Sequence, residues 1–345
     1  MRTITWVASA LGVMSVGFLG WWLGSAGAPE PRAGVPVHGA LVVWSPGYRV
    51  SFFGVERLHP IDTYRADKVA AHLVDEGLLG MDDFAVPAPA SDERLRRVHD
   101  ADYLASLHDT PVLARAIEVP VPDVFPRAVV ERRVRRAFRL AAEGTVVAAA
   151  GALQTGLGIN LGGGFHHARP SLGHGFCIYG DVALAIATLR DEGFTGKVLI
   201  VDTDAHQGDG NHAFFATDPS VFSLSVHEGD LFPHPKLAGD LDLMLSSGDG
   251  DAELMAALDR VEVVVDEQQP ALIVHVAGAD VLHDDPLTGL QVTVDGLVAR
   301  DLRVLQLARE RGIPLVHTLA GGYGPSAALA QSRSVAAMLR AAGEI

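Results

Sequence analysis

Cysteine is almost absent from this chain of 345 residues. Cys177 is the single one, so no disulfide can form within the chain, and zinc modules that rely on cysteine ligands are excluded. A metal ion held by this chain must therefore bind to histidine and carboxylate side chains.

Positive charge is scarce as well. The sequence has 27 Lys and Arg residues against 42 Asp and Glu residues, which gives a net charge of −15. An electric field of this sign repels phosphate backbones, so we expect no nucleic acid partner. A basic peptide or a polyamine would suit the same field.

Charged side chains are missing altogether between residues 4 and 28. This run is long enough to cross a bilayer, which takes about 20 apolar residues, and Arg2 favours an amino terminus that stays in the cytoplasm. We expect residues 1–28 to be a membrane anchor, with the remaining chain outside the cytoplasm. The small residues at 26–28 also fit an exported protein with a cleaved signal peptide, whereas a mis-assigned start would leave the protein cytoplasmic. Residues 29–39, with three prolines, are predicted to be a linker.

Continuous, non-alternating apolar runs of strand length occur at 198–201, 272–276 and 314–319. Such runs are typical of parallel strands that are buried on both faces. Helix-like stretches lie at 128–153, 181–192 and 251–267. The pattern predicts one α/β domain over residues 40–345, with a single open parallel sheet flanked by helices. The arginine cluster on 128–153 is interpreted as a solvated helix face.

Polar, ligand-type residues or glycines follow four of the apolar stretches directly, at 162–168, 202–209, 277–280 and 320–323. Ligands of open parallel sheets bind beyond the carboxyl ends of the strands. We therefore expect these four segments to meet in one site.

The second and third of these segments contain a candidate metal site. Asp204 and His206 are two residues apart, so on an extended segment both side chains point to the same side. Asp280, from a neighbouring strand end, can complete the set of three ligands that a catalytic zinc uses, with one position left open for water. The sequence thus predicts one zinc ion per chain.

Two adjacent histidines, His166 and His167, follow three glycines. Two imidazoles beside an activated water can take a proton from it and return one to a leaving amine. Asp202 and Asp209 flank the metal ligands and can orient them. The alternative that both histidines are metal ligands stays open. Tyr323, in a glycine-rich turn, can direct a phenol at a developing oxyanion.

Together, in this order, the motifs resemble the signature of the histone deacetylase family, over roughly residue 40 to the carboxyl terminus. They are GGGFHHA at 162–168, GFC at 175–177, DxDxHxGD at 202–209, GAD at 278–280 and GGY at 321–323. SPxY at 45–48, LHP at 58–60 and Gln207 after the ligand histidine are most similar to the class IV branch. Two positions depart from many relatives, Gly180 where an asparagine is common and Ala320 where some have glycine.

The resemblance implies an arginase–deacetylase fold with the active site at the carboxyl ends of the strands. It also assigns roles to the residues above. Zinc would be held by Asp204, His206 and Asp280. His167 with Asp209 would be the main general base and acid, His166 with Asp202 would give electrostatic support, and Tyr323 would polarise the substrate carbonyl.

Two further sites are implied by the same resemblance. A structural potassium ion would lie near Asp202 and Ser225. A substrate tunnel would be lined by Gly175, Phe176 and Phe232, the last of which lies in a loop that is shorter here. His174 is a candidate for the tunnel rim, and His99, His227, His275, His283 and His317 are interpreted as packing or loop histidines.

We therefore predict a zinc-dependent amidohydrolase that removes acetyl or longer acyl groups from an acylated amine such as acyl-lysine. Three alternatives remain: an acetylpolyamine or other small-amide deacetylase, a dinuclear ureohydrolase of the arginase type, and a non-catalytic acyl-lysine binder. A dinuclear site needs additional aspartate ligands. Degenerate catalytic residues would favour a binder, and here His166, His167 and Tyr323 are intact.

Overall fold

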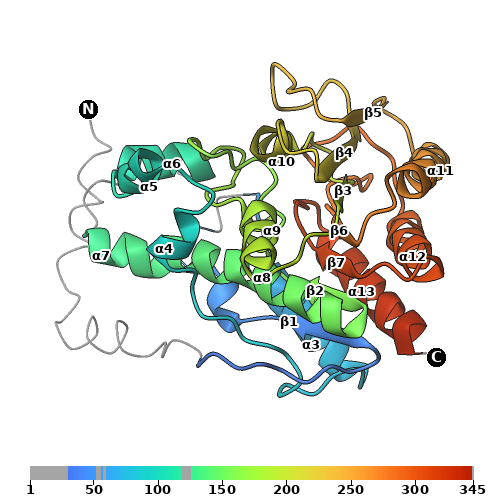
Figure 1. Cartoon of the computed structure of the whole chain (residues 1–345), viewed down its shortest axis with the longest axis horizontal. Coiled ribbons are helices and arrows are strands. Elements are labelled where there is room, and N and C mark those ends of the chain that lie inside the picture. The colour runs from blue at the N-terminus through green and yellow to red at the C-terminus, as the bar shows by residue number, and fades with distance from the viewer. Residues whose placement is uncertain (1–29, 52–55, 57–59, 119–125, 344–345) are drawn as a thin grey trace, which may run out of the picture. The chain divides into compact units, whose positions relative to one another are not determined.

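Figure 1 shows the computed structural model of the chain. The structure describes residues 30–51, 56, 60–118 and 126–343. The predicted anchor or signal peptide, and His59 of the LHP motif, lie outside these residues. Among the helices that the structure describes, none is long and apolar enough to cross a membrane.

Seven strands form one sheet in the order β1-β2-β7-β6-β3-β4-β5, and every neighbouring pair is parallel. The strands are β1 (Ala40–Val43), β2 (Leu157–Asn160), β3 (Val198–Asp202), β4 (Val221–Glu228), β5 (Leu241–Leu245), β6 (Leu272–Val276) and β7 (Leu315–Thr318). The apolar runs of the sequence form β3, β6 and β7, and these strands are buried along their whole length. The prediction of a single open parallel sheet is confirmed.

Helices cover both faces of this sheet (Figure 1). One apolar core packs beneath α3 (Arg65–Asp75), α11 (Asp251–Gln268), α12 (Val294–Glu310) and α13 (Ala327–Gly343). A second core lies on the other face, beneath α4 (Asp92–Leu95), α5 (Ala101–Ser106), α6 (Thr110–Ile117), α7 (Arg127–Val130), α8 (Arg136–Thr155) and α9 (Asp181–Asp191). Shorter elements are the 3-10 turn η1 (Pro46–Tyr48) and α10 (Asp209–Phe215). The helices predicted at 181–192 and 251–267 are thus confirmed as α9 and α11.

The predicted helix over 128–153 is interrupted by a π-helical turn, η3 (Glu131–Arg135), between α7 and α8. The interpretation of its arginines as a solvated face is wrong for Arg135, which is buried. Its guanidinium donates to the Tyr179 hydroxyl over 3.1 Å and pairs with Glu131 over 2.6 Å. A buried cation needs such partners, and nothing in the local sequence shows that Tyr179 supplies one.

The segment predicted to be a linker is described from residue 30 onward. Arg32 and Val86 exchange two backbone hydrogen bonds of 2.9 and 2.8 Å, and the Val35 amide donates to the Asp83 carbonyl. Part of this segment is therefore fixed to the folded domain, and its role as a linker stays a prediction.

The four strands that precede the predicted site segments, β2, β7, β6 and β3, are consecutive neighbours in the sheet. Their last residues are in register: Asn160 pairs with Thr318, Val276 with Thr318, and Asp202 with Val276. All four segments consequently leave the sheet from the same edge, where their side chains can meet.

Candidate active site

Three ligand-type side chains meet at this edge, from the ends of β3 and β6. The Nδ1 atom of His206 lies 3.2 Å from Asp204 Oδ1 and 2.9 Å from Asp280 Oδ2. Ligand atoms of all three residues lie within 4.8 Å of one another, and all three residues are buried. The structure thus brings together the three residues predicted as metal ligands.

This donor set fits a zinc ion. Ligand atoms about 2.1 Å from a tetrahedral zinc lie about 3.4 Å apart, close to the separations seen here. The second oxygens of the carboxylates are held by backbone amides, since Ala205 donates to Asp280 Oδ1 and Gly321 donates to Asp204 Oδ2, each over 2.9 Å. Burial and repulsion by Asp204 raise the pKa of Asp280. A bound dication would stabilise both carboxylates in their charged form and so compensate for the burial and for the repulsion.

Each histidine of the adjacent pair has its own carboxylate. His166 Nδ1 donates to Asp202 Oδ2 over 2.8 Å, and His167 Nδ1 donates to Asp209 Oδ1 over 2.6 Å. Burial alone would lower the pKa of His166, but attraction by Asp202 and Asp204 outweighs it and raises the pKa to about 9. Burial and the neighbouring His166 charge lower the pKa of His167 to about 3. His167 is therefore the neutral imidazole of the pair, with Nε2 free to accept a proton.

Asp209 has two further partners that the sequence did not indicate. Arg169 contacts its Oδ2 through Nε at 2.7 Å and through a terminal nitrogen at 2.6 Å, and His174 Nε2 donates to the same oxygen over 3.0 Å. Burial would raise the pKa of Asp209, but the hydrogen bonds and charges of His167 and His174 outweigh it and lower the pKa far below its usual value. Asp209 is thus a fixed anion that orients His167. His174, predicted at the rim, lies against the catalytic carboxylate and is partly exposed.

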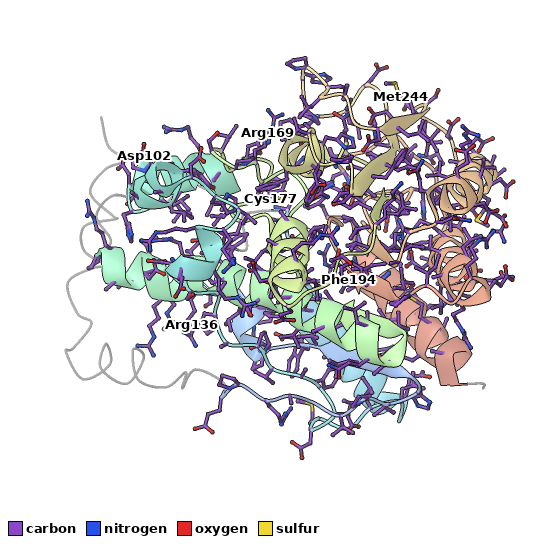
Figure 2. The ribbon with its side chains drawn as sticks, viewed as in Figure 1. Asp102, Arg136, Arg169, Cys177, Phe194 and Met244 are labelled. Carbon is purple, nitrogen blue, oxygen red and sulfur yellow. The ribbon has the colours of Figure 1, made fainter. Side chains whose placement is uncertain are left out.

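The loop that carries the two histidines is fixed by Asp181, the first residue of α9. Its carboxylate accepts the amide protons of Gly164 and Phe165, each over 2.7 Å, and the hydroxyl proton of Thr145 over 2.6 Å. This loop connects β2 with α9, and Figure 2 labels two of its residues, Arg169 and Cys177. No sequence motif assigned a site role to Asp181, because its partners lie 16 to 36 residues away in the chain.

The turn that carries Tyr323 is held from two sides. Arg65 of α3 donates to the carbonyls of Ala320 and Gly322, and Asp285 accepts the amide protons of Tyr323 and Gly324 over 2.6 and 3.0 Å. Burial and the nearby Asp280 carboxylate raise the pKa of Tyr323 well above its usual value. The phenol therefore stays protonated near neutral pH and can donate a hydrogen bond.

The three residues predicted for the tunnel lie around these catalytic groups. The Phe176 ring packs edge-on against Tyr323 with 5.6 Å between centroids, and the Phe232 ring packs edge-on against His167 at 4.9 Å. Gly175 adopts a φ of +55°, and a Cβ there would lie 2.5 Å from Cδ2 of His167. Only glycine lets the backbone approach the imidazole so closely.

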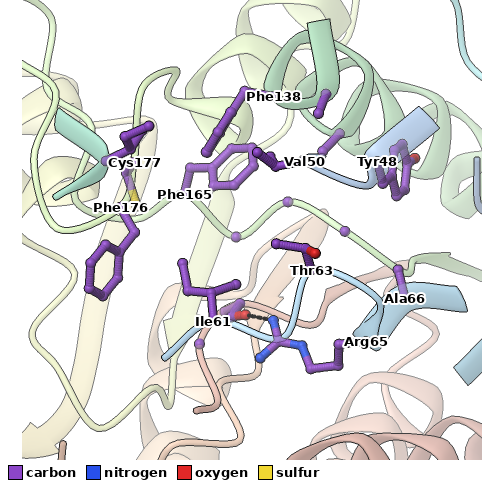
Figure 3. Close-up of a pocket in the computed structure, with 18 of the residues that line it drawn as sticks. Tyr48, Val50, Ile61, Thr63, Arg65, Ala66, Phe138, Phe165, Phe176 and Cys177 are labelled. Atoms are coloured by element: carbon purple, nitrogen blue, oxygen red, sulfur yellow. Dashed lines mark hydrogen bonds between the residues drawn. The ribbon is translucent and has the colours of Figure 1, made fainter. Parts of the chain in front are cut away.

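A cavity of about 180 Å³ opens next to Tyr323 and His166. Figure 3 shows Phe138, Phe165 and Val50 on one side of it and Ile61 with Arg65 on the other. The Phe138 and Phe165 rings pack with 5.2 Å between centroids. The cavity wall is mostly apolar.

The two residues predicted for a potassium site are neighbours in the sheet. Asp202 on β3 pairs with Ser225 on β4. The Ser225 hydroxyl accepts the Gly208 amide proton over 3.3 Å and bonds to His227 Nδ1 over 2.9 Å. The arrangement places oxygen atoms together, and a potassium ion there stays a prediction.

Similarity to known proteins agrees with this geometry. The family model described as histone deacetylase domain matches residues 59–341. Histone deacetylase 2 of Arabidopsis thaliana is 37% identical over 300 residues, which cover 85% of this chain and 77% of that protein. The acetoin utilization protein AcuC of Staphylococcus aureus is 30% identical over 256 residues, covering 69% of this chain and 66% of AcuC.

Solved structures extend the similarity to the fold. The crystal structure of the HDA15 HD domain matches with a TM-score of 0.71 and 24% sequence identity, covering 88% of each chain. Together with the match to the family model, this similarity confirms the predicted arginase–deacetylase fold.

Proposed function

This chain belongs to the histone deacetylase family, and from that premise we propose that it is a zinc-dependent hydrolase that removes acetyl or longer acyl groups from an amine such as acyl-lysine. One observation carries the proposal. The buried set Asp204, His206 and Asp280 lies beside the His167–Asp209 pair, and the neighbouring His166 and Tyr323 line a mostly apolar cavity. The class IV assignment stays a prediction.

The proposed chemistry divides between a metal ion and the side chains. Zinc, when bound, would supply a Lewis acid that makes the attacking water more acidic and polarises the substrate carbonyl. His167 takes a proton from the attacking water through Nε2 and later donates it to the leaving amine nitrogen. Asp209 holds the Nδ1 proton of His167, which keeps Nε2 directed at the substrate.

Tyr323 and His166 stabilise charge that develops during the reaction. The protonated Tyr323 hydroxyl donates to the carbonyl oxygen as it becomes an oxyanion. His166, paired with Asp202, contributes positive charge directly beside His167, with 4.0 Å between the two ring centroids. Phe176 and Phe232 pack against the catalytic side chains and exclude water from them.

The apolar cavity supports acyl groups longer than acetyl. A cavity of about 150 Å³ accommodates benzene, so a cavity of this size has room for at least about six carbon atoms. Its volume here is about 180 Å³, and Phe138 and Phe165 line it together with the aliphatic side chains of Val134, Ala137 and Ala141. A linear acyl chain of medium length suits this environment.

The alternatives find less support. Among the residues that the structure describes, the ligand cluster at this site has three members, and a dinuclear ureohydrolase needs more carboxylates than that. A non-catalytic binder has no need for two complete His–Asp pairs. The substrate panel described next distinguishes lysine from a polyamine as the amine carrier.

The test is to measure zinc by elemental analysis and hydrolysis on a panel of substrates. The panel contains acyl-lysine peptides of increasing chain length together with acetylpolyamines. We expect about one zinc per chain, inhibition by hydroxamates, and loss of both zinc and turnover in Asp280→Ala. Stoichiometric zinc in that variant would contradict the ligand assignment, and zinc-loaded protein inactive on the whole panel would contradict the function.

A further inference from the structure

The largest fully buried side chain of the described residues is a cation, Arg300 of α12. Its Nε donates to Asp301 Oδ1 over 2.8 Å, and one terminal nitrogen donates to the carbonyls of Thr203 and Gly278 over 3.0 and 2.6 Å. Thr203 directly precedes the ligand Asp204, and Gly278 lies two residues before the ligand Asp280. One guanidinium therefore joins the backbone at the ends of β3 and β6, immediately beside the metal site.

Burying this cation is costly. Removing a charge from water costs several kcal/mol even after relaxation, and an apolar pair of similar volume is often as stable or more so. Arg300 is therefore hard to explain by stability alone. Its carboxylate partner, Asp301, is itself fixed by the Ser334 hydroxyl of α13. The guanidinium is thus held rigidly from the helix layer while it holds the strand ends.

The position of Gly278 decides where the ligands can lie. A Cβ on Gly278 would overlap Oδ2 of Asp204 and lie 2.7 Å from Oδ1 of Asp280. The backbone at Gly278 thus packs directly against both carboxylates. A small displacement there changes the separation of the two ligands, which repel each other.

Another interpretation of this region is a second metal site. Ligand atoms of His275, Asp301 and His317 lie within 4.8 Å of one another. Their atoms are already engaged, since His275 Nε2 bonds to the Thr203 hydroxyl over 2.9 Å and His275 Nδ1 to His317 Nδ1 over 3.3 Å. Arg300 also places its positive charge on Asp301, which disfavours a cation. The cluster is better described as a hydrogen-bonded wall behind the ligands.

We propose that Arg300, oriented by Asp301, is a positioning residue that fixes the distance between the β3 and β6 ends and thereby sets the zinc affinity and coordination geometry. The inference rests on the proposed zinc site at Asp204, His206 and Asp280. We call Arg300 and Asp301, with the contacts that they make, the clamp. Figure 1 shows α12, which carries both residues, side by side with α13 and next to β6 and β7. Mutation of residues that support metal ligands typically changes the metal affinity by about 10- to 100-fold.

The test compares four variants of the full chain, with His317→Ala as a fifth that reports on the second metal site. Arg300→Met with Asp301→Asn removes the clamp and leaves no unpaired buried charge, so the protein should fold. Arg300→Lys keeps the charge but loses the fork that reaches both carbonyls and Asp301. Ser334→Ala leaves the guanidinium contacts in place. Arg303→Met, on the same helix, removes an arginine that pairs with Glu262 and serves as the matched control.

Two quantities are measured besides thermal stability: the zinc dissociation constant in competition with a chelator, and the visible spectrum of the Co²⁺-loaded protein. We expect the double variant to bind zinc about 10- to 100-fold more weakly and to shift the Co²⁺ bands. Arg300→Lys should recover part of the affinity. Ser334→Ala, which removes only the support of Asp301, should lose less affinity than the double variant, and Arg303→Met should match the wild type.

Several results would overturn the proposal. A folded double variant with the zinc affinity and the Co²⁺ spectrum of the wild type would contradict it. If the double variant does not fold, wild-type affinity and spectrum in Arg300→Lys would contradict it instead. An equal loss in Arg303→Met would show that the effect is not specific to the clamp. Two zinc ions per chain, one of them lost in His317→Ala, would establish the second metal site instead. Zinc bound normally but without hydrolysis of any substrate would contradict the proposed function alone.

Discussion

Acidification should lower the free energy of unfolding of this protein through one buried histidine, His99. Its Nε2 accepts the Gly180 amide proton over 2.9 Å, and its Nδ1 donates to the carbonyls of Arg169 and Pro170 over 3.1 and 3.2 Å. Protonation of Nε2 would place two N–H groups face to face. The contacts also join two parts of the loop that follows the catalytic histidines, at 169–170 and at 180, so the ring must stay neutral for this part of the loop to keep its place.

The size of the effect follows from the pKa. Burial lowers the pKa of His99 from 6.5 to about 4. The unfolded chain binds the proton first as the pH falls, so the stability from neutral His99 is complete above about pH 6.5 and is lost progressively toward pH 4. The full shift corresponds to about 3 kcal/mol, of which about 2 kcal/mol should be lost between pH 7.5 and pH 5.

The assay is denaturant unfolding of wild type and His99→Gln at about pH 7.5 and pH 5. The variant should be less stable at the higher pH by about 1–3 kcal/mol, because hydrogen bonds are lost, and the difference should shrink by about 2 kcal/mol at the lower pH. Other buried histidines cancel in this comparison. Tyr103→Phe is the control: it removes a hydrogen bond to Ile178 in the same cluster and should cost about 1 kcal/mol at both pH values. Parallel curves for wild type and His99→Gln would refute the reasoning.

Four further predictions concern activity and location. His167→Ala should lower turnover by roughly 100- to 10,000-fold while zinc content and hydroxamate affinity stay unchanged, as steady-state kinetics and inhibitor titration would show. Tyr323→Phe should lower kcat by about 100-fold or more, and near-wild-type kcat would exclude the hydroxyl as oxyanion donor. Gly175→Ala should lower turnover at least about 10-fold, since its Cβ would displace His167, whereas Gly193→Ala, also at positive φ but with no neighbour within 4 Å, should affect stability only. Reporter fusions placed directly after segment 4–28 should be active only outside the cytoplasm; activity confined to a cytoplasmic reporter would reverse the topology.

Much of the fold was predictable because its signals are local in sequence. The runs that form β3 and β6 are mostly apolar and do not alternate with polar residues, as is typical of strands buried on both faces. Polar residues directly after a parallel strand must lie at its carboxyl edge, so the sequence alone places Asp204 and Asp280 together.

The supporting residues were not predictable, because their roles depend on contacts across long stretches of chain. Arg65 reaches the Tyr323 turn from a helix more than 250 positions earlier, and Arg300 looks like an ordinary polar position of a helix. Arg169 lies two residues after His167, yet only the folded loop shows that it shares Asp209. The spacing of motif residues in the sequence identifies the catalytic and ligand groups. The residues that position these groups can come from any element that packs nearby.

The π-helical turn η3 bears on how this active site can change in evolution. Val134, within the turn, and Ala137 and Phe138, just after it, all line the cavity. A π-helical turn contains one residue more than the α-helix around it, and deleting one residue rotates the preceding segment by about 100°. A single-codon deletion here would move Val134 away from the cavity while every catalytic group kept its place. A lineage could thus alter the acyl groups that it accepts by insertion or deletion of one codon, in a helix that takes no part in the reaction.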